Sequence, residues 1–291
     1  MLLTRRQFIR SLGWTAAAVA GAAVYPTFIE PRRVAVRHIH LTPAGLSPAL
    51  EGLTIAHLTD LHRSRYVSAA YLAACVDQAN ALTPDLFAFT GDYVTANHFG
   101  RLGSLILGAG TRLPEYATQV AACIGRARAR HGVFACLGNH DHWFDAADMT
   151  QRLTAAGATV LRNAHTIVRI NGVALPIAGV DDAWVGNADV RRACAGLTAP
   201  FVLVLMHQPA LFGRWPLSGS HLILAGHTHG GQVCLPVRGP LYLDASMRKY
   251  SHGVFQRGET LMYVSRGLGV IPPPVRFNCR PEIALVHLHC A

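Results

Sequence analysis

The amino-acid sequence predicts an α/β fold in which a mixed sheet is covered on both faces. First, five short runs of the chain are almost entirely apolar and have the length of strands. Runs without polar alternation are typical of strands that are buried on both sides. Second, stretches with the apolar spacing of helices separate some of these runs. Third, one segment has the pattern of a β-hairpin, which indicates antiparallel pairing beside the parallel strands.

Each apolar run ends shortly before a residue of a type that binds metal ions. The runs comprise residues 53–58, 86–89, 133–137, 201–206 and 222–225. In a sheet of buried strands, functional groups lie at the strand ends, because the strands themselves are filled with apolar side chains. We therefore expect the five following segments to converge on one edge of the sheet.

Two stretches are predicted to be the covering helices. Residues 68–82 and 116–130 carry apolar residues at helical spacing. Ser68 precedes the first apolar turn and is expected to cap that helix.

Two further elements complete the predicted sheet. Residues 166–170 and 173–180 flank the pair Asn171-Gly172, which favours a tight hairpin turn. Residues 32–41 alternate in a way that predicts an edge strand joining the amino-terminal segment to the core.

The polar segments after the five runs contain carboxylates, an amide and imidazoles in a fixed order. They are Asp60-Leu61-His62, Gly91-Asp92, Gly138-Asn139-His140-Asp141, His207 and Gly226-His227-Thr228-His229. These donors suit manganese, iron or zinc, and no cysteine lies among them. A purely structural role would leave Asp92 and several histidines close together without a compensating charge. Two divalent ions about 3.5–4 Å apart can clamp a phosphoryl group and lower the pKa of a shared water.

This ordered set resembles the calcineurin-like metallophosphoesterases, over about residues 53–290. The extended segment 226–232 and the tail segments 265–269, 274–277 and 281–283 are similar to a subgroup of exported or membrane-associated bacterial enzymes. That subgroup includes the YkuE-like phosphoesterases and certain UDP-diacylglucosamine pyrophosphatases. The resemblance implies a four-layer α/β/β/α sandwich with mixed sheets.

The resemblance also implies a role for each residue of the site. One divalent ion would be held by Asp60, His62 and His229. The other would be held by Asn139, His207 and His227. Asp92 would bridge the two ions, and His140 would assist the leaving group or stabilise the phosphoryl charge.

The expected reaction is hydrolysis of a phosphomonoester, a phosphodiester or a pyrophosphate. A hydroxide that bridges the two ions would attack phosphorus, and His140 would help the leaving group depart, without a covalent enzyme intermediate. For Asp141 two interpretations stay open: it orients the ring of His140, or it caps the following helix.

Several other polar residues are candidates with a second interpretation. Arg266 and Arg276 are expected to bind an anionic substrate, because a guanidinium grips phosphate with two hydrogen bonds. Alternatively, both arginine side chains lie on the surface in contact with water. His142 either lines the pocket or lies on the surface, and Asp181-Asp182 either shapes the site edge or forms a turn.

The first 30 residues have the form of a twin-arginine export signal or an amino-terminal anchor, which leaves residues 31–291 as one metallophosphoesterase domain. Arg5-Arg6 precedes an apolar, alanine-rich stretch at residues 12–24, which is short for a membrane span. The signal implies the Tat export machinery as a partner and a periplasmic or cell-envelope location. Export after folding would allow the metal ions to be loaded in the cytoplasm.

The net charge of +10 favours anionic partners. A membrane surface or a lipid-linked substrate is therefore a candidate partner. Nucleic-acid binding is not expected, because the chain has no basic stripe interleaved with aromatic residues. An apolar, glycine-flanked stretch within residues 95–114 follows Asp92, and it either receives an acyl chain or covers the core. The seven cysteines have no CxxC spacing, so neither a zinc-thiolate site nor a disulfide framework is indicated.

Two alternatives to an envelope phosphoesterase stay open. A UDP-2,3-diacylglucosamine pyrophosphatase of lipid A biosynthesis would fit a protein that the leader only anchors at the membrane. A non-catalytic metal-binding scaffold on the same fold would usually lack some ligands, whereas this chain has residues at all the expected positions.

Overall fold

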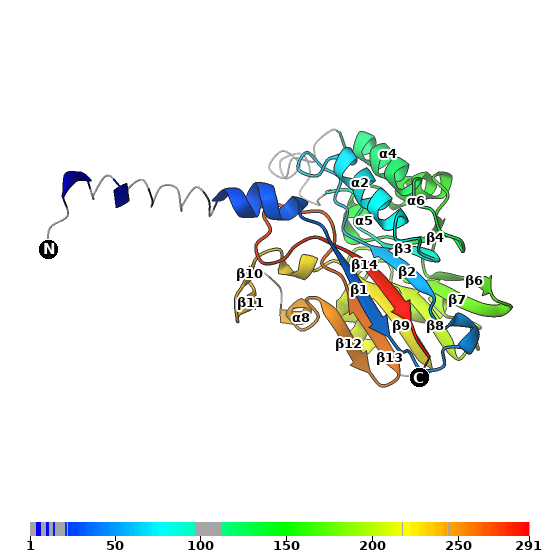
Figure 1. Ribbon diagram of the computed structural model, residues 1–291. Helices are drawn as coiled ribbons and strands as arrows, with labels where there is room; N and C mark the ends of the chain where they lie inside the picture. The colour runs from blue at the N-terminus through cyan, green and yellow to red at the C-terminus, as the bar shows by residue number, and fades with distance from the viewer. Residues whose placement is uncertain are drawn as a thin grey trace.

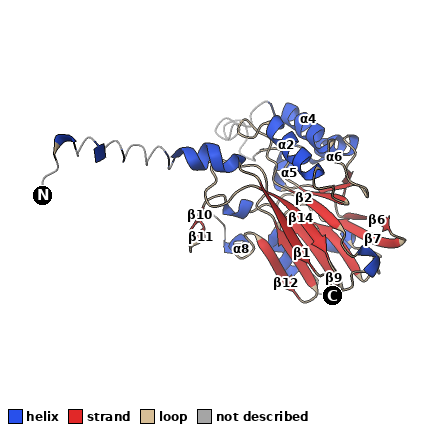
Figure 2. Ribbon diagram, in the orientation of Figure 1, coloured by secondary structure: helices blue, strands red, loops and turns tan. Residues whose placement is uncertain are grey.

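The computed structural model has four layers in the order helix, sheet, sheet, helix (Figures 1 and 2). It describes residues 4–6, 10, 11, 14, 21, 23–96, 112–216, 218–241, 243 and 245–290. The predicted α/β class and the mixed four-layer sandwich are confirmed. The strand pattern alone indicated one sheet between helices, whereas two sheets are present and each buries one face of the other.

The first sheet has six strands, and all but one of its pairings are parallel. Its order is β1 (Ala35–Leu41), β14 (Glu282–Leu288), β2 (Thr54–Leu58), β3 (Leu86–Thr90), β4 (Val133–Cys136) and β5 (Thr159–Val160). The exception is the antiparallel pair of β14 and β2. The predicted edge strand is β1, which pairs on one side only.

The second sheet also has six strands and mixed pairing. Its order is β12 (Gly253–Arg257), β13 (Thr260–Val264), β9 (Ser220–Ala225), β8 (Phe201–Leu205), β7 (Val173–Gly179) and β6 (Ala164–Ile170). The predicted hairpin joins β6 to β7. Its turn residues Asn171 and Gly172 have φ values of 50° and 82°, the left-handed conformation that this residue pair adopts at little cost.

Alternate side chains of the apolar strands enter different layers. In β3, Leu86 and Ala88 face the other sheet, whereas Phe87 and Phe89 face the helices. In β8, Leu203 lies between the sheets and Val204 on the outer face of the second sheet. Both faces of each strand are therefore buried, which explains why these strands have no polar alternation.

Helices cover the two outer faces. The first sheet is covered by α2 (Ala69–Asn80), α4 (Leu113–Ile124) and α6 (Ala146–Ala155) (Figure 1). Shorter elements cover the second sheet, and these are α7 (Val190–Ala193), η5 (Pro209–Arg214) and the neighbourhood of α8 (Ala245–Arg248). The remaining elements are η1 (Tyr25–Ile29), η2 (Glu30–Arg32), η3 (Pro48–Leu50), α5 (Asn139–Phe144), η6 (His229–Gly231), β10 (Cys234–Leu235) and β11 (Gly239–Pro240).

Both predicted helices exist, with shifted boundaries. Ser68 caps α2 as expected, because its hydroxyl accepts a hydrogen bond from the Tyr71 N–H at 3.2 Å. Helix α4 begins three residues earlier than predicted and ends six residues sooner. Pro114 in its first turn favours the early start, and Gly125 at its end weakens helix propagation.

The last residues of the predicted leader are packed against the carboxy-terminal tail. The Pro26 carbonyl accepts a hydrogen bond from the Arg276 N–H at 2.8 Å. The Glu30 side chain is buried and accepts the Cys279 N–H at 2.6 Å. Residues from 26 onward therefore belong structurally to the folded unit.

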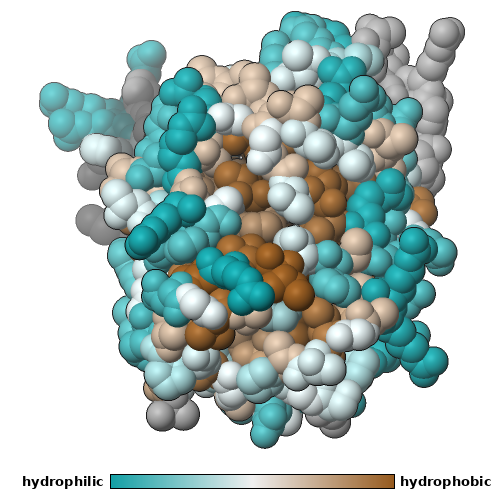
Figure 3. Space-filling model, turned by 90° about the vertical axis from the view of Figure 1, so that its right-hand side faces the viewer, coloured by the Kyte–Doolittle hydropathy of each residue, from teal (hydrophilic) through white to brown (hydrophobic). Residues whose placement is uncertain are grey.

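Much of the leader, and the stretch at 97–111, lie outside the described residues. In the part of the chain that is described, no helix is both long and apolar enough to cross a membrane. On the side of the molecule that carries β6 and β7, Figure 3 shows hydrophobic side chains gathered near the centre and hydrophilic ones around them. All seven cysteines are free thiols.

Candidate functional site

Eight polar residues follow the ends of five strands, each within four residues of its strand. The residues are Asp60 and His62 after β2, Asp92 after β3, Asn139 and His140 after β4, His207 after β8, and His227 and His229 after β9. Three strands belong to the first sheet and two to the second. The site therefore lies at the junction of the two sheets.

The backbone at this site is held in an unusual conformation. Asp60, His62, Asp92, His227 and His229 all have φ between 46° and 71°. Residues other than glycine rarely adopt this left-handed region, and each such residue costs roughly 1 kcal/mol or more. Such strain is typical of functional sites, where the surrounding fold enforces the direction of a side chain.

Glycines allow the loops to approach one another. A Cβ atom at Gly138 would lie 2.3 Å from Asp92 Oδ1, and one at Gly226 would lie 2.4 Å from Asp60 Oδ2. A Cβ atom at Gly267, in the tail, would lie 2.6 Å from the Asp60 Cβ atom. The glycines of the Gly-Asn-His and Gly-His-Thr-His segments thus provide the space that the two carboxylates occupy.

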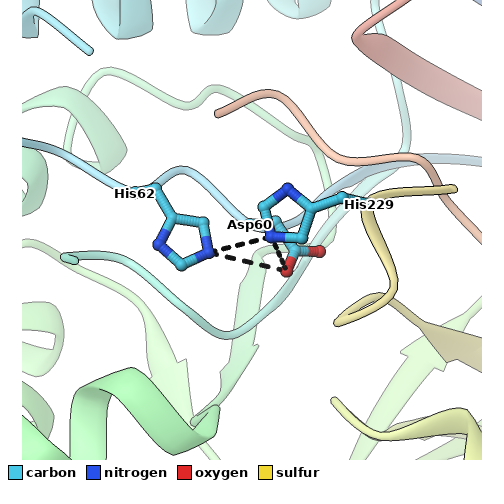
Figure 4. A group of neighbouring side chains, drawn as sticks. All are labelled: Asp60, His62 and His229. Carbon is cyan, nitrogen blue, oxygen red and sulfur yellow. Dashed lines mark hydrogen bonds and ion pairs between the residues drawn. The ribbon is translucent and has the colours of Figure 1, made fainter. Parts of the chain in front are cut away.

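The first group of donor atoms consists of Asp60, His62 and His229, whose side chains point toward one another (Figure 4). His229 Nε2 lies 3.0 Å from His62 Nε2 and 3.3 Å from Asp60 Oδ1. His62 Nε2 lies 3.9 Å from the same carboxylate oxygen. The Asp60 carboxylate is itself held by the His227 N–H at 2.9 Å and by the neighbouring Thr59 hydroxyl.

The second group consists of Asp92, His207 and His227. His207 Nε2 lies 3.1 Å from Asp92 Oδ2 and 3.2 Å from His227 Nδ1. The other nitrogen of His207 donates to the Thr90 carbonyl at 2.6 Å, which fixes the ring. Asp92 Oδ2 also lies 3.4 Å from His62 Nε2, so one carboxylate oxygen stands between the two groups.

A buried polar atom without a partner lies beside the second group. Asn139 Oδ1 has no hydrogen-bond partner among the described residues, although it is buried. Such atoms are costly unless a ligand satisfies them. Ligands about 2.1 Å from one ion lie about 3.0–3.4 Å from each other, which is close to several of the separations above. The donor set therefore fits two divalent ions.

The electrostatics of the centre favour cations. Burial acts to raise the pKa of the Asp60 carboxyl, but nearby imidazoles outweigh it and hold the pKa below its ordinary value. The pKa of Asp92 is likewise held well below its ordinary value. Burial lowers the pKa of His62, and it lowers that of His227 to about 3. Burial opposes protonation of His207 too, but Asp92 raises its pKa to about 10. Ionised Asp60 and Asp92 beside neutral His62 and His227 attract cations. A cation that binds His207 would displace the proton that Asp92 favours there.

His140 lies at the edge of the centre. Its Nε2 atom is 4.0 Å from Asp92 Oδ2, and its own N–H donates to Asp92 Oδ1 at 2.9 Å. Its Nδ1 atom is hydrogen-bonded to the Ala96 carbonyl. Burial lowers the pKa of the ring to about 4. A nearby anion would raise that pKa again.

Asp141 joins the loop after β3 to the start of α5 instead of orienting His140. Its carboxylate accepts the N–H groups of Asp92 and Tyr93, each at 2.8 Å, and that of Gly138 at 2.9 Å. The expectation that it orients the His140 ring is wrong, because the Ala96 carbonyl occupies that nitrogen. The capping interpretation holds in part, since Gly138 is the N-cap of α5.

The substrate-binding expectation for Arg276 is corrected. This side chain is completely buried, and its guanidinium donates to five main-chain carbonyls, which belong to His229, Arg266, Gly267, Gly269 and Cys279. No donor is left for a phosphate. Arg266 lies 3.8 Å from Glu282 and is absent from the described lining of the cavity beside the site. Arg276 therefore does not fit the expected role, whereas the role of Arg266 stays a prediction.

The structure also gives the positions of His142, Asp181 and Asp182, for which two interpretations were open. His142 Nε2 is hydrogen-bonded to Asp181 Oδ1 at 2.7 Å, and Arg162 pairs with the second oxygen of Asp181 at 3.1 Å. One Asp182 oxygen accepts the N–H groups of Trp184 and Val185, so this residue forms a turn. His142 is thus engaged by Asp181 and is not among the described lining residues of the cavity beside the site.

A cavity of about 930 Å³ opens beside the donor atoms. Its polar end is formed by Asp92, Asn139, His140, His227 and His229. Its larger part is apolar and is lined by Trp143, Trp184, Val233, Leu241, Leu243, Met247, Ile271, Pro272, Pro273 and Val275. Trp143 lies in α5 and Met247 in α8, and the other residues come mainly from irregular segments, so no periodic pattern in the sequence indicated that they form one wall.

Comparison with known proteins agrees with this site. The family of the calcineurin-like phosphoesterases matches residues 53–231. The uncharacterized metallophosphoesterase YkuE of Bacillus subtilis is 31% identical over 98% of this chain and 98% of its own length. The phosphodiesterase YaeI of Escherichia coli is 29% identical over 99% of this chain and 100% of its own. Among solved structures, the NAD nucleotidase NadN of Haemophilus influenzae has a TM-score of 0.47 at 15% identity, over 75% of this chain and 46% of that chain.

The buried guanidinium gives a stability prediction. Arg276→Met should lower the free energy of unfolding by about 3 kcal/mol or more, because it leaves buried carbonyls without donors. Arg266→Met is the matched control and should cost less than about 1 kcal/mol, since its ion pair is long. Chemical denaturation of both variants measures the difference, and equal losses would contradict the structural role of Arg276.

Proposed function

This chain belongs to the calcineurin-like phosphoesterase family, and we propose that it hydrolyses phosphate esters with two divalent metal ions held at the junction of its sheets. The observation that carries the proposal is the position of Asp92 Oδ2, within 3.4 Å of imidazole nitrogens from both donor groups. A carboxylate that two clusters share is the arrangement that a pair of neighbouring ions needs.

The seven ligands are assigned by donor group. Asp60, His62 and His229 hold one ion, and Asn139, His207 and His227 hold the other, with Asp92 between them. Manganese, iron and zinc all suit this mixture of oxygen and nitrogen donors. When bound, the ions supply an activated water as nucleophile and neutralise the charge of the phosphoryl group.

His140 donates a proton to the leaving group. Its Nδ1 atom is engaged by the Ala96 carbonyl, so Nε2 is the atom that faces the centre and moves a proton. Because a bound phosphate raises the pKa of a neighbouring imidazole, the ring becomes a competent acid only when substrate is present. Asp92 fixes its backbone through the hydrogen bond to the His140 N–H.

The apolar part of the cavity indicates what the substrate carries. Ten apolar or aromatic residues adjoin the metal-binding end, whereas a small polar phosphate ester would leave this wall in contact with water. A substrate with a long apolar group would bury it. This supports a lipid-linked phosphate ester in the cell envelope as the substrate class.

The location is proposed from the leader. Arg5-Arg6 and the apolar stretch after it have the form of a twin-arginine export signal. We place the enzyme outside the cytoplasmic membrane, in the periplasm or held at the membrane by its amino terminus. The second candidate is hydrolysis of UDP-2,3-diacylglucosamine on the cytoplasmic side, which the same apolar wall favours because that substrate carries two acyl chains.

Substitutions at the centre separate metal binding from proton transfer. Asp92→Asn should abolish turnover and reduce bound metal, because it removes the charge shared by both donor groups. His140→Ala should reduce turnover about 10²- to 10⁴-fold with metal largely kept. Elemental analysis and a diester assay measure the two effects. Asp77→Asn, on the exposed surface in an ion pair with Arg126, is the control. Loss of both ions in His140→Ala would contradict the assignment.

The apolar wall predicts selectivity for chain length. Leu241→Glu should lower kcat/KM for a long-chain phosphate ester at least about tenfold, since a charge replaces apolar contact, and leave the methyl ester unchanged. Val237→Glu is the matched control, because Val237 is fully exposed and lies outside the described lining of the cavity. Equal loss on both esters would count against an apolar subsite.

Fractionation decides between the two locations. Cells expressing the full chain should show metal-dependent hydrolysis in the periplasmic or outward-facing fraction, measured with a model diester and with UDP-diacylglucosamine in the same preparation. Replacement of Arg5-Arg6 by two lysines should retain the activity inside the cell. Cleavage of the nucleotide lipid by an inward-facing enzyme would favour the second candidate.

A further inference from the structure

Four histidines project from neighbouring strands at the end of the first sheet. His38 and His40 are on β1, His287 is on β14, and His289 follows directly after β14. Residues two apart on a strand share a face, and His40 pairs in register with His287. We refer to these four residues as the histidine ladder.

The rings of the ladder alternate between the two strands. His287 stacks on His38 and on His40, with ring centroids 5.2 Å and 4.6 Å apart. His40 in turn stacks on His289 at 5.2 Å. The interplanar angles are between 11° and 22°, so the four rings form one continuous stack.

The stack brings imidazole nitrogens together in two pairs. His38 Nδ1 lies 2.9 Å from His287 Nε2, and His40 Nδ1 lies 3.0 Å from His289 Nε2. In the absence of an ion, one nitrogen of each pair donates a proton to the other. The same separation suits two nitrogens that share one ion at about 2.0–2.1 Å.

Glu51 determines which ring nitrogen of His289 carries the proton. Its Oε1 atom accepts the His289 Nδ1–H at 2.9 Å, and its other oxygen accepts the Cys290 N–H. This leaves His289 Nε2 with a lone pair directed at His40. A carboxylate behind a histidine is the arrangement that orients imidazole ligands in metal sites and raises their basicity.

The ladder is far from the phosphoesterase centre. His287 pairs with Thr54, the first residue of β2, whereas Asp60 follows the opposite end of that strand. Six residues of extended chain separate these positions by about 20 Å. Ions in one site therefore do not share ligands with the other.

We propose that the histidine ladder is an additional metal site, which binds a late first-row divalent ion such as Ni²⁺, Cu²⁺ or Zn²⁺ between β1 and β14. Imidazole is the preferred nitrogen ligand for these ions, and affinity for nitrogen donors rises toward copper. The ladder is exposed to solvent, so water completes the coordination. This site does not depend on the proposed phosphoesterase activity.

Connectivity supports the proposal. An ion held here would link the first and last strands of the domain, since β1 and β14 are far apart in sequence. Ligands that bind only the folded state raise its stability.

The test compares the wild-type full chain with the double variant His40→Gln/His289→Gln. Both are titrated with Ni²⁺ by calorimetry, and bound metal is counted by elemental analysis after dialysis. Because both chains keep the phosphoesterase centre, the difference between them belongs to the ladder. We expect wild type to bind at least one more equivalent, to gain more in melting temperature from Ni²⁺, and to show nitrogen couplings in Cu²⁺ electron paramagnetic resonance that the variant loses.

Two further variants complete the design. Glu51→Gln should weaken the additional site about 10- to 100-fold while leaving the strand residues intact. His131→Gln removes a histidine outside the ladder and should change neither the metal count nor the affinity. Manganese-dependent diester hydrolysis should be the same in all variants, which confirms that each is folded. Equal metal count and equal affinity in wild type and the double variant would overturn the proposal.

Discussion

The burial of two ionised carboxylates is the constraint on which the rest of the site depends. Asp60 and Asp92 are almost inaccessible to solvent, and a charge in such a place needs hydrogen bonds and an opposite charge nearby. Main-chain N–H groups supply part of this, from His227 to Asp60 and from His140 to Asp92. These hydrogen bonds do not neutralise the two carboxylates, so a cation in the space between the imidazoles would be favourable. This explains why histidines from both sheets face that space.

This constraint also explains the backbone around the site. Left-handed residues and glycines at loop contacts are both unfavourable for an isolated chain. Here they bring loops from two sheets within contact distance, and Asp141 fixes the loop after β3 to the start of α5 by accepting their N–H groups. The rigid sandwich below provides the packing energy that holds them in place. The backbone of the site is therefore strained, and the packing of the whole sandwich stabilises it.

Much of this arrangement could be predicted from the sequence, and the exceptions have physical reasons. The five strands were predictable because both of their faces are buried, which leaves an unbroken apolar run. The polar residues that follow these strands were predictable because their types and their order can be read directly from the chain. Arg276 was not, because its burial depends on the fold of the tail, and an isolated arginine has the same pattern whether it contacts phosphate or carbonyls. The apolar wall was also missed, since Leu241, Met247 and Ile271 meet only in three dimensions.

The contact between Glu30 and the Cys279 N–H has a consequence for maturation of the chain. A protease that cut after residue 30 would remove the acceptor of a buried donor and release the turn that carries Arg276. Any processing compatible with this fold must cut upstream of Pro26. Under the proposed amino-terminal anchor, an uncut chain would keep the folded unit close in sequence to its attachment, because Pro26 and Glu30 are held against the tail.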